Sequence, residues 1–260
     1  LYHNEELDML ITSPQPGLDI LGKYYESVDY ISHTDSKRSL FEKMYHFVKS
    51  IALKNKLNLI NSQQPNKGSI LDIGAGTGEF LSVARQDGWK TIGVEPSDKA
   101  KAIAKNKGVS FVEETSELEN HSFDVISMWH VLEHVYELDE YFNFFKSRLN
   151  KDGKLLLALP NPASFDAGYF EEYWAAYDVP RHIYHFTPAT ITALAAKYGF
   201  KLQKSRGLIF DSFYISLLSN EYKTGNKRLL HSFLIGFISN LRAMLGKRNY
   251  SSNLYTFEHA

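Results

Sequence analysis

Short apolar runs alternate with amphipathic stretches along residues 69–159. The runs have the length and composition of buried strands, and the stretches between them have the 3.6-residue period of helices. The predicted strands are 69–73, 91–94, 109–112, 123–129 and 154–159. The predicted helices are 79–86, 98–105 and 138–149, with a polar turn at 150–153 before the fifth strand. This alternation predicts an α/β protein with a parallel sheet covered on both faces.

Residues 1–68 precede this pattern and differ from it. Residues 1–35 show weak periodicity and are expected to form an ordered arm. Asp35 or Ser36 is a candidate cap for a helix that runs to about Ile60, and the polar run 61–68 ends it. Its apolar stripe consists of Leu40, Met44, Phe47, Val48 and Ile51. We therefore expect 1–68 to be an arm and a helix that pack on a domain formed by 69–260.

The alternation of strands and helices is interrupted at residues 160–186, which are rich in aromatic residues and are here called the lid insertion. Thr187-Pro188 then predicts a helix start, because Thr is a good N-cap and Pro suits the first helical position. Gly199 ends that helix. A sixth strand at 200–206, a helical insertion at 209–246 and a closing seventh strand at 253–258 are expected to follow.

Composition narrows the possible functions. The 260 residues include no cysteine, which excludes disulfides, thiolate chemistry and a Cys-type zinc site. The net charge of −1 provides no basic excess for nucleic acid, so a small-molecule substrate is expected. No basic start followed by an apolar run and a cleavage site appears, so the expected location is cytoplasmic. Leu1 stands where Met would begin a chain, so we expect that native residues precede it.

The clearest motif is the glycine-rich stretch at 72–78, directly after an apolar strand. Glycines allow a sharp turn and a close approach to a ligand, and the next helix directs its N-terminus at that ligand. The dinucleotide fingerprint needs a third glycine where this chain has Glu79. Asp72, two residues before Gly74, would also repel a pyrophosphate. These two carboxylates favour a ligand with ammonium and sulfonium groups, namely S-adenosylmethionine.

A second acidic residue supports a nucleoside site. Glu95 follows the second strand and lies 21 residues after Gly74, where a carboxylate can accept hydrogen bonds from ribose hydroxyls. Enzymes that use NAD share this feature, so Glu95 alone does not choose the cofactor. The alternative is a solvated glutamate before Pro96.

The segment 123–135, Phe-Asp-Val-Ile-Ser-Met-Trp-His-Val-Leu-Glu-His-Val, completes a recognisable set. Together with the glycine loop and Glu95 it resembles the class I S-adenosylmethionine-dependent methyltransferases over residues 69–160. The likeness is greatest to the branch with ubiquinone-biosynthesis O-methyltransferases and sugar or small-molecule methyltransferases. The resemblance implies a Rossmann-like, doubly wound seven-stranded sheet of order 3-2-1-4-5-7-6 with its last strand antiparallel.

The resemblance also implies roles for individual residues. Those implied to hold the methionyl part are Asp72, Gly74, Ala75 and Gly76. Glu95 would hold the ribose, with Pro96 beside the adenine. Glu113 or Glu114 would lie near the adenine amine. Trp129 and His130 would lie against the cofactor at the end of the fourth strand.

A metal site is the alternative interpretation of His130 and His134, which have Glu133 between them and lie four residues apart, so that the histidines would share a helical face. The zinc motif H-E-x-x-H, however, places Glu directly after the first histidine, and Val131 stands there. We therefore predict no metal.

The lid insertion ends in Tyr-Asp-Val-Pro-Arg-His-Ile-Tyr-His-Phe-Thr at 177–187. His182 and His185 can move a proton near neutral pH. Related methyltransferases carry a similar Arg-His-x-x-x-Phe sequence, which implies His182 as first choice for a general base and His185 as second. The alternative is that both histidines only fasten the lid insertion. The lid aromatics Phe165, Tyr169, Phe170, Tyr173 and Trp174 suit either ring stacking on a substrate or the core.

The predicted function is S-adenosylmethionine-dependent O-methylation of a sugar, quinone-like or lipid-linked small molecule, with nitrogen and carbon acceptors open. A non-catalytic S-adenosylmethionine-binding protein and an NAD-type oxidoreductase are the alternatives.

The roles of two further segments are open. The Tyr-rich stretch 24–33 is a candidate cover for the cofactor or simple surface packing. The apolar helix near 229–245, too short and too polar to span a bilayer, suits a cleft cover or homodimer contact more than a membrane surface.

Overall fold

The computed structural model describes residues 1–5, 9–17, 20, 24, 40–246 and 248–260. The caps expected at Asp35 or Ser36, and the stretch 24–33 apart from Tyr24, lie outside these residues. The chain divides into two compact units, which are described separately. The first unit contains 1–15, 128–147 and 151–260, and the second contains 16–127 and 148–150.

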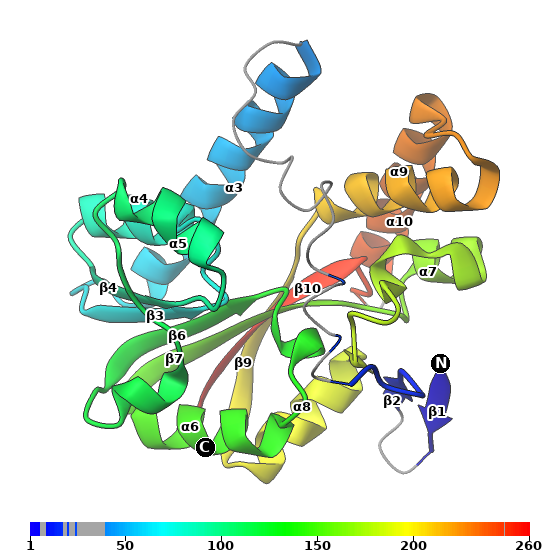
Figure 1. Cartoon of the computed structure of the whole chain (residues 1–260). Coiled ribbons are helices and arrows are strands. Elements are labelled where there is room, and N and C mark those ends of the chain that lie inside the picture. Colours follow the sequence, from blue (N-terminus) through cyan, green and yellow to red (C-terminus); the bar gives the residue numbers. More distant parts are fainter. Residues whose placement is uncertain (6–8, 18–19, 21–23, 25–39, 247) are drawn as a thin grey trace. The chain divides into compact units, whose positions relative to one another are not determined.

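The large sheet has seven strands in the order β5-β4-β3-β6-β7-β10-β9 (Figure 1). Their bounds are β3 Ser69–Ile73, β4 Lys90–Val94, β5 Ser110–Val112, β6 Phe123–Trp129, β7 Leu149–Pro160, β9 Phe200–Gly207 and β10 Ser252–His259. Numbered along the chain this order is 3-2-1-4-5-7-6. The closing strand β10 pairs antiparallel with both β7 and β9. The predicted sheet order and the reversed last strand are therefore confirmed.

The second unit contains the parallel strands β3, β4 and β5, in which Ile70 pairs with Thr91 and Ile92 with Ser110. Its helices are α3 Leu40–Gln63, α4 Glu79–Gln86 and α5 Asp98–Lys105, with a short 3-10 helix η2 at Thr115–Leu118. Ser97 caps α5 by accepting a hydrogen bond from the Ala100 amide. Leucine, isoleucine and alanine side chains from the strands and from α4 are fully buried and form the core.

Most element boundaries agree with the predicted ones within a residue or two, but the turn expected at 150–153 is wrong. The helix α6, Leu138–Arg148, ends directly before β7, which already begins at Leu149. Leu149 is buried, and the Asn150 side chain donates a hydrogen bond to Asp124 of β6. These two tertiary contacts hold the polar segment in the extended conformation, although its Asn, Asp and Gly residues favour a turn locally.

The first unit contains the lid insertion and the helical insertion. Its elements, besides those given above, are β1 Tyr2–Asn4, β2 Met9–Ile11, η3 Leu132–His134, α7 Phe165–Phe170, η4 Glu171–Tyr173, η5 Ala175–Tyr177, β8 Tyr184–His185, α8 Pro188–Lys197, α9 Asp211–Thr224 and α10 Leu229–Leu245. Thr187 caps α8 as predicted, accepting from the Thr190 amide. No helix in the described ranges is long and apolar enough to cross a membrane.

The N-terminal arm forms strands that the sequence pattern did not predict. The strands β1, β2 and β8 make a separate three-stranded sheet, in which Leu10 pairs with His185 and Ile11 with Tyr184. The hydroxyl of Thr12 adds a hydrogen bond to the carbonyl of His182. The start of the chain is thus joined to the histidine segment of the lid insertion.

The lid insertion is built around its own apolar cluster. Phe170 and Trp174 are almost fully buried there, together with Ile215 of α9 and Ile235 of α10. Two of the five lid aromatics considered for substrate stacking are therefore core residues. Tyr169 and Tyr173 remain about two-fifths exposed, at 40% and 39%.

Candidate functional site

The glycine loop between β3 and α4 has the backbone conformation that its glycines predict. Gly74, Gly76 and Gly78 all have positive φ, at 71°, 52° and 69°. The amides of Gly74 and Ala75 both donate to the Val94 carbonyl, which fixes the loop over the end of β4. Among the described residues, no atom lies within 4 Å of a Cβ placed on Gly76, so this part of the structure leaves open space in front of the turn.

Glu95 is attached to this loop. One carboxylate oxygen accepts from the Gly76 amide at 2.8 Å, and the other accepts from the Ser97 amide at 2.9 Å. Glu95 is buried, while the next residue, Pro96, is exposed. Each oxygen has a second lone pair available for a ligand. The solvated glutamate considered as the alternative is thus not what this unit contains.

Asp72 lies in β3 just before the loop and is only 3% exposed. Its Oδ1 accepts a hydrogen bond from Ser127 Oγ at 2.6 Å. Burial raises the pKa of Asp72 to about 6, against the smaller opposing effects of the Ser127 hydrogen bond and the Lys56 charge. Burial deprives the ionised carboxylate of its stabilisation by water. A bound cation would replace that stabilisation, so this site favours a cationic group.

Glu79, at the position of the third fingerprint glycine, is the first residue of α4 and pairs with Lys49 at 2.8 Å and Lys107 at 3.5 Å. A side chain of this size and charge stands where the dinucleotide motif needs a glycine. Glu113 follows β5, and its largely exposed carboxylate pairs with Lys101 at 3.0 Å. Its predicted place beside an adenine is untested. Glu114 instead caps η2.

Trp129 ends β6, and His130 follows with a left-handed backbone, φ 57°. The His130 amide donates to the Ala158 carbonyl. Its ring lies between two carboxylates, with Nε2 3.1 Å from Asp211 and Nδ1 3.5 Å from Glu133. Burial acts to lower the pKa of His130, but these two carboxylates outweigh it and raise the pKa to about 10. The imidazole is therefore a cation in this unit.

The shared helical face assumed for His130 and His134 does not exist. The 3-10 turn η3 covers only Leu132–His134, and His130 precedes it in a non-helical conformation. The structure brings together a different set, since ligand atoms of Glu133, His134 and His182 all lie within 4.8 Å of one another. Their edge-to-face histidine rings have centroids 4.5 Å apart.

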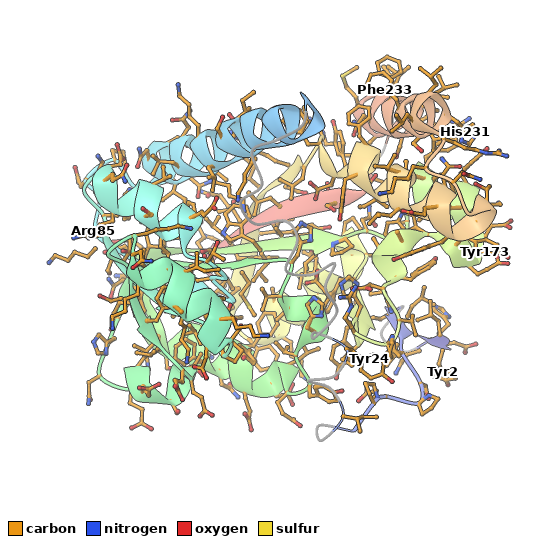
Figure 2. All side chains as sticks on the ribbon, turned by 45° about the horizontal axis from the view of Figure 1, so that its top comes forward. Tyr2, Tyr24, Arg85, Tyr173, His231 and Phe233 are labelled. Atoms are coloured by element: carbon orange, nitrogen blue, oxygen red, sulfur yellow. The ribbon has the colours of Figure 1, made fainter. Side chains whose placement is uncertain are left out.

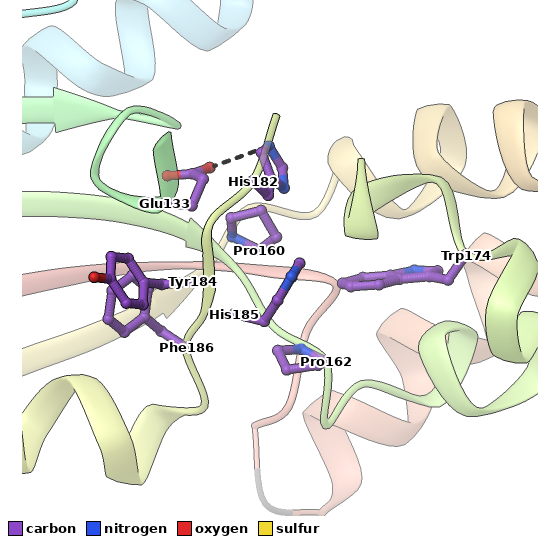
Figure 3. A pocket seen from close by; sticks show the side chains of 8 residues that line it. All are labelled: Glu133, Pro160, Pro162, Trp174, His182, Tyr184, His185 and Phe186. Atoms are coloured by element: carbon purple, nitrogen blue, oxygen red, sulfur yellow. Dashed lines mark ion pairs between the residues drawn. The ribbon is translucent and has the colours of Figure 1, made fainter. Parts of the chain in front are cut away.

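His182 is 7% exposed, and its hydrogen bonds define its tautomer. Its Nδ1 lies 2.9 Å from the Ala176 carbonyl, which can only accept, so Nδ1 carries the hydrogen. Nε2 then carries the lone pair and lies 3.7 Å from an Asp178 carboxylate oxygen and 4.0 Å from one of Glu133. Figure 3 shows the contact with Glu133. Burial lowers the pKa of His182 to about 4, although Glu133 opposes the shift. The ring is neutral at pH 7, with Nε2 as the atom able to accept a proton.

His185 has the opposite tautomer. The Thr12 hydroxyl donates to the His182 carbonyl at 2.5 Å, so it can only accept from His185 Nε2, 3.3 Å away. Nε2 of His185 is therefore a donor that ties the lid insertion to the N-terminal arm. Burial lowers the pKa of His185 to about 3. These contacts agree with the fastening role that was the alternative for His185, and they make His182 the better candidate base.

A small pocket lies beside these histidines (Figure 3). Its lining residues are Glu133, Pro160, Pro162, Trp174, His182, Tyr184, His185 and Phe186. Carboxylate and imidazole groups meet apolar rings here.

Several residues of this cluster were not identified from the sequence. Glu133 was considered only as part of a zinc pattern, and Asp178 and Asp211 were not singled out. Asp211 begins α9, about 80 residues after the histidine that it contacts, so no local spacing could reveal the pair. Asp178 lies four residues before His182, and that spacing was available as a signal.

The second unit contains a parallel α/β sheet with a glycine loop and an acidic residue after the next strand, which defines a Rossmann-like nucleoside-binding fold. A family model described as methyltransferase domain matches residues 39–205, more than half of the chain. The chain therefore belongs to the methyltransferase domain family.

Two comparisons extend this result. An uncharacterized methyltransferase from Alkaliphilus oremlandii is 29% identical over 106 residues, which cover 37% of this chain and 47% of that protein. The match thus spans about half the length of the curated relative.

Among solved structures, magnesium protoporphyrin IX methyltransferase from Synechocystis with bound S-adenosylhomocysteine has a TM-score of 0.62 at 14% identity, covering 94% and 100% of the two chains. The 1,6-didemethyltoxoflavin N1-methyltransferase of Burkholderia thailandensis has a TM-score of 0.57 at 14% identity, covering 100% and 98%. At these identities the likeness shows the class I methyltransferase fold.

Proposed function

We propose that this protein is an S-adenosylmethionine-dependent methyltransferase that acts on a small molecule. The observation that carries the proposal is the hydrogen bond from the Gly76 amide to Glu95, because it joins the glycine loop to the acidic residue expected at a ribose. The family assignment supports the same class. A non-catalytic binding protein and an NAD-type oxidoreductase are less well supported, the latter because Glu79 replaces a required glycine.

The residues of the second unit fit S-adenosylmethionine by charge and shape. The buried carboxylate of Asp72 suits the ammonium group, and Glu95 has lone pairs for two ribose hydroxyls. Gly74, Ala75 and Gly76 present backbone groups with open space before Gly76. Pro96 and Glu113 complete the proposed set in this unit. The family resemblance implies Trp129 and His130 as further cofactor residues. When bound, the cofactor supplies a methyl group that its sulfonium has already activated.

We further propose that the acceptor atom is a hydroxyl oxygen and that His182 removes its proton. The hydroxyl proton would pass to Nε2, which the Ala176 contact leaves unprotonated. Asp178 and Glu133 would stabilise the imidazolium that forms. The proposed acceptor is a sugar, quinone-like or lipid-linked molecule, as the resemblance to small-molecule methyltransferases implies. His185 is proposed to position this segment through Thr12.

The first experiment separates the three classes of function. Isothermal titration with S-adenosylhomocysteine and with NAD should show binding of the former only. Incubation with radiolabelled S-adenosylmethionine and panels of phenols, quinols and sugar hydroxyls should then yield labelled product, whose methyl resonance identifies an O-methyl group. Binding of S-adenosylhomocysteine without turnover on any panel would favour a binding protein, and binding of NAD alone would overturn the proposal.

The second experiment tests His182. The variant His182→Ala should lose turnover by about 100-fold or more while its affinity for S-adenosylhomocysteine stays unchanged. The matched variant His185→Gln should lose stability more than turnover.

The same assay with a chelator tests whether Glu133, His134 and His182, whose ligand atoms lie close together, bind a metal ion. Turnover that disappears with chelator and returns with a divalent cation would replace the proton-transfer role by metal binding.

A further inference from the structure

The helices α9 and α10 form a hairpin that packs through small and polar side chains. Its buried positions are Ser212, Ile215, Ser216, Ser219 and Asn220 on α9, and Ser232, Ile235, Gly236, Ser239 and Ala243 on α10. A Cβ on Gly236 would come within 3.0 Å of the Phe213 backbone, so the helices are in close contact. The side chain of Asn220 donates to Ser232 at 2.7 Å. Of the large apolar residues of α10, Ile235 is buried in this interface, and the Phe233 ring stacks on Phe213 of α9 with centroids 5.0 Å apart.

Most large apolar residues of α10 lie on its outside. Phe233, labelled in Figure 2, is 62% exposed, and Leu230 is 90% exposed. The stripe continues at helical spacing through Leu234, Phe237, Leu241, Met244 and Leu245, each at least 38% exposed. An amphipathic helix of a water-surrounded protein has the reverse arrangement, with its apolar stripe toward the core. A patch this large on a monomer marks a binding surface.

Basic residues predominate around this stripe. Residues 222–257 include no Asp or Glu, while six basic residues fall within them, and Glu221, directly before this range, pairs with Lys227 at 3.7 Å. The six basic residues are Lys223, Lys227, Arg228, Arg242, Lys247 and Arg248. Lys227 and Arg228 precede α10, and Arg242 and Arg248 lie at its other end with their residues exposed. The chain as a whole has a net charge of −1, so the basic residues are concentrated here.

These charges distinguish between two occupants of the surface. In a two-fold contact with antiparallel α10 helices, the basic start of one helix would meet the basic end of the other, and Glu221, next to the start, already pairs with Lys227 of its own chain. A bilayer with anionic headgroups offers acyl chains to the apolar stripe and negative charge to both ends. Charge complementarity therefore favours the bilayer over a second copy.

We propose that α10 lies in the surface of an anionic membrane, with its outward stripe of leucine and phenylalanine residues inserted among the lipids and the flanking basic residues on the headgroups. This binding goes beyond the proposed catalytic function and does not depend on it. Ser239 of α10 donates a hydrogen bond to Asp166 of the lid insertion. The proposed membrane-binding helix is thus linked directly to the lid insertion.

Sedimentation with vesicles tests the proposal. The full chain should bind vesicles of mixed phosphatidylglycerol and phosphatidylcholine, with weak binding to phosphatidylcholine alone and release by high salt. The triple variant Leu230→Gln, Leu234→Gln, Phe237→Gln should lower the partition coefficient at least about tenfold. A matched triple control, Leu1→Gln, Tyr2→Gln, Leu202→Gln, changes exposed apolar residues elsewhere in the same unit and should bind normally.

The charge contribution is tested with a second pair of variants. Lys227→Gln with Arg228→Gln should weaken binding to the anionic vesicles about tenfold, while Lys151→Gln with Lys204→Gln should not. Equal loss in both pairs would show unspecific attraction and overturn the proposal. The proposal would also be overturned if the full chain did not bind vesicles. The same holds if the chain sediments as a dimer and the apolar triple variant converts it to a monomer. Unchanged circular dichroism and melting temperature confirm that each variant is folded.

Discussion

Ser127 donates a hydrogen bond of 2.6 Å to Asp72 in the interior of the second unit. The carboxylate is 3% exposed, and burial holds its pKa at about 6 against an ordinary 3.8. A folded-state pKa above the unfolded value means that the protonated form is favoured on folding. The stability from Asp72 is thus fully present below pH 3.8 and is lost as the pH rises through 6.

Asp72→Asn should therefore stabilise the ligand-free protein at pH 8. The amide cannot ionise, and its oxygen can still accept from Ser127. The pKa difference sets a ceiling of roughly 3 kcal/mol on the gain. Thermal denaturation at pH 8 and pH 4.5 measures it, with a rise in melting temperature at pH 8 and a rise about one third as large at pH 4.5. A lower melting temperature at pH 8 would show that the charge is already compensated in the folded protein.

The same residue should make cofactor affinity depend on pH. If Asp72 binds the ammonium of S-adenosylmethionine, binding requires the ionised carboxylate, and affinity should fall up to about tenfold per pH unit below 6. Titration calorimetry with S-adenosylhomocysteine at pH 5, 6 and 7.5 measures this dependence. Asp72→Asn should bind weakly at all three values, with a flat profile. A steep profile in that variant would assign the titration to another group.

These two predictions rest on a residue that the sequence identified, and this was possible because its neighbourhood is local. The strand, the glycines and the helix start at Glu79 follow within a few residues, so pattern and spacing were sufficient. The helix 98–105 and the cap at Thr187 were likewise predicted from local sequence. The end of α6 and the start of β7 were misjudged because burial of Leu149 overrides local turn preference.

The surroundings of His182, the proposed base, were less predictable because their contacts join distant segments of the chain. His182 was singled out, but its partners come from η3 and from the arm before residue 15. The strand β2 has only three residues, too few for a periodic signal, and it exists because β8 offers it a partner. Which histidine nitrogen bears a hydrogen follows only from such tertiary contacts.

Asp166 is expected to be the main polar support of the lid insertion. It is fully buried, and its two oxygens accept from Trp174 Nε1 at 2.8 Å, Ser239 Oγ at 2.6 Å and Ser251 Oγ at 2.7 Å. Asp166→Ala would leave three buried donors without an acceptor, at a cost of about 3–5 kcal/mol. Urea unfolding of this variant should show the loss, with about 1 kcal/mol for Ser239→Ala as the comparison. Equal, small losses of unfolding free energy in Asp166→Ala and Ser239→Ala would show that water replaces the Asp166 carboxylate as hydrogen-bond acceptor.

The pair His130–Asp211 should control the protonation of His130. With Nε2 3.1 Å from Asp211 and Nδ1 3.5 Å from Glu133, His130 should remain charged through pH 8 in an imidazole-resolved NMR titration. Asp211→Asn removes one carboxylate and should lower this pKa by about one to two units.

Stability should change with pH in the corresponding direction. The folded-state pKa of about 10 lies above the usual 6.5, so the stabilisation is fully present below pH 6.5 and is lost as the pH rises through 10. Because the side chain is 38% exposed, solvent screening reduces the effect to about 1 kcal/mol or less. The melting temperatures of wild type and Asp211→Asn should therefore differ most at pH 6 and converge near pH 10. A difference that is constant with pH would assign the role of Asp211 to the first turn of α9 instead of to His130.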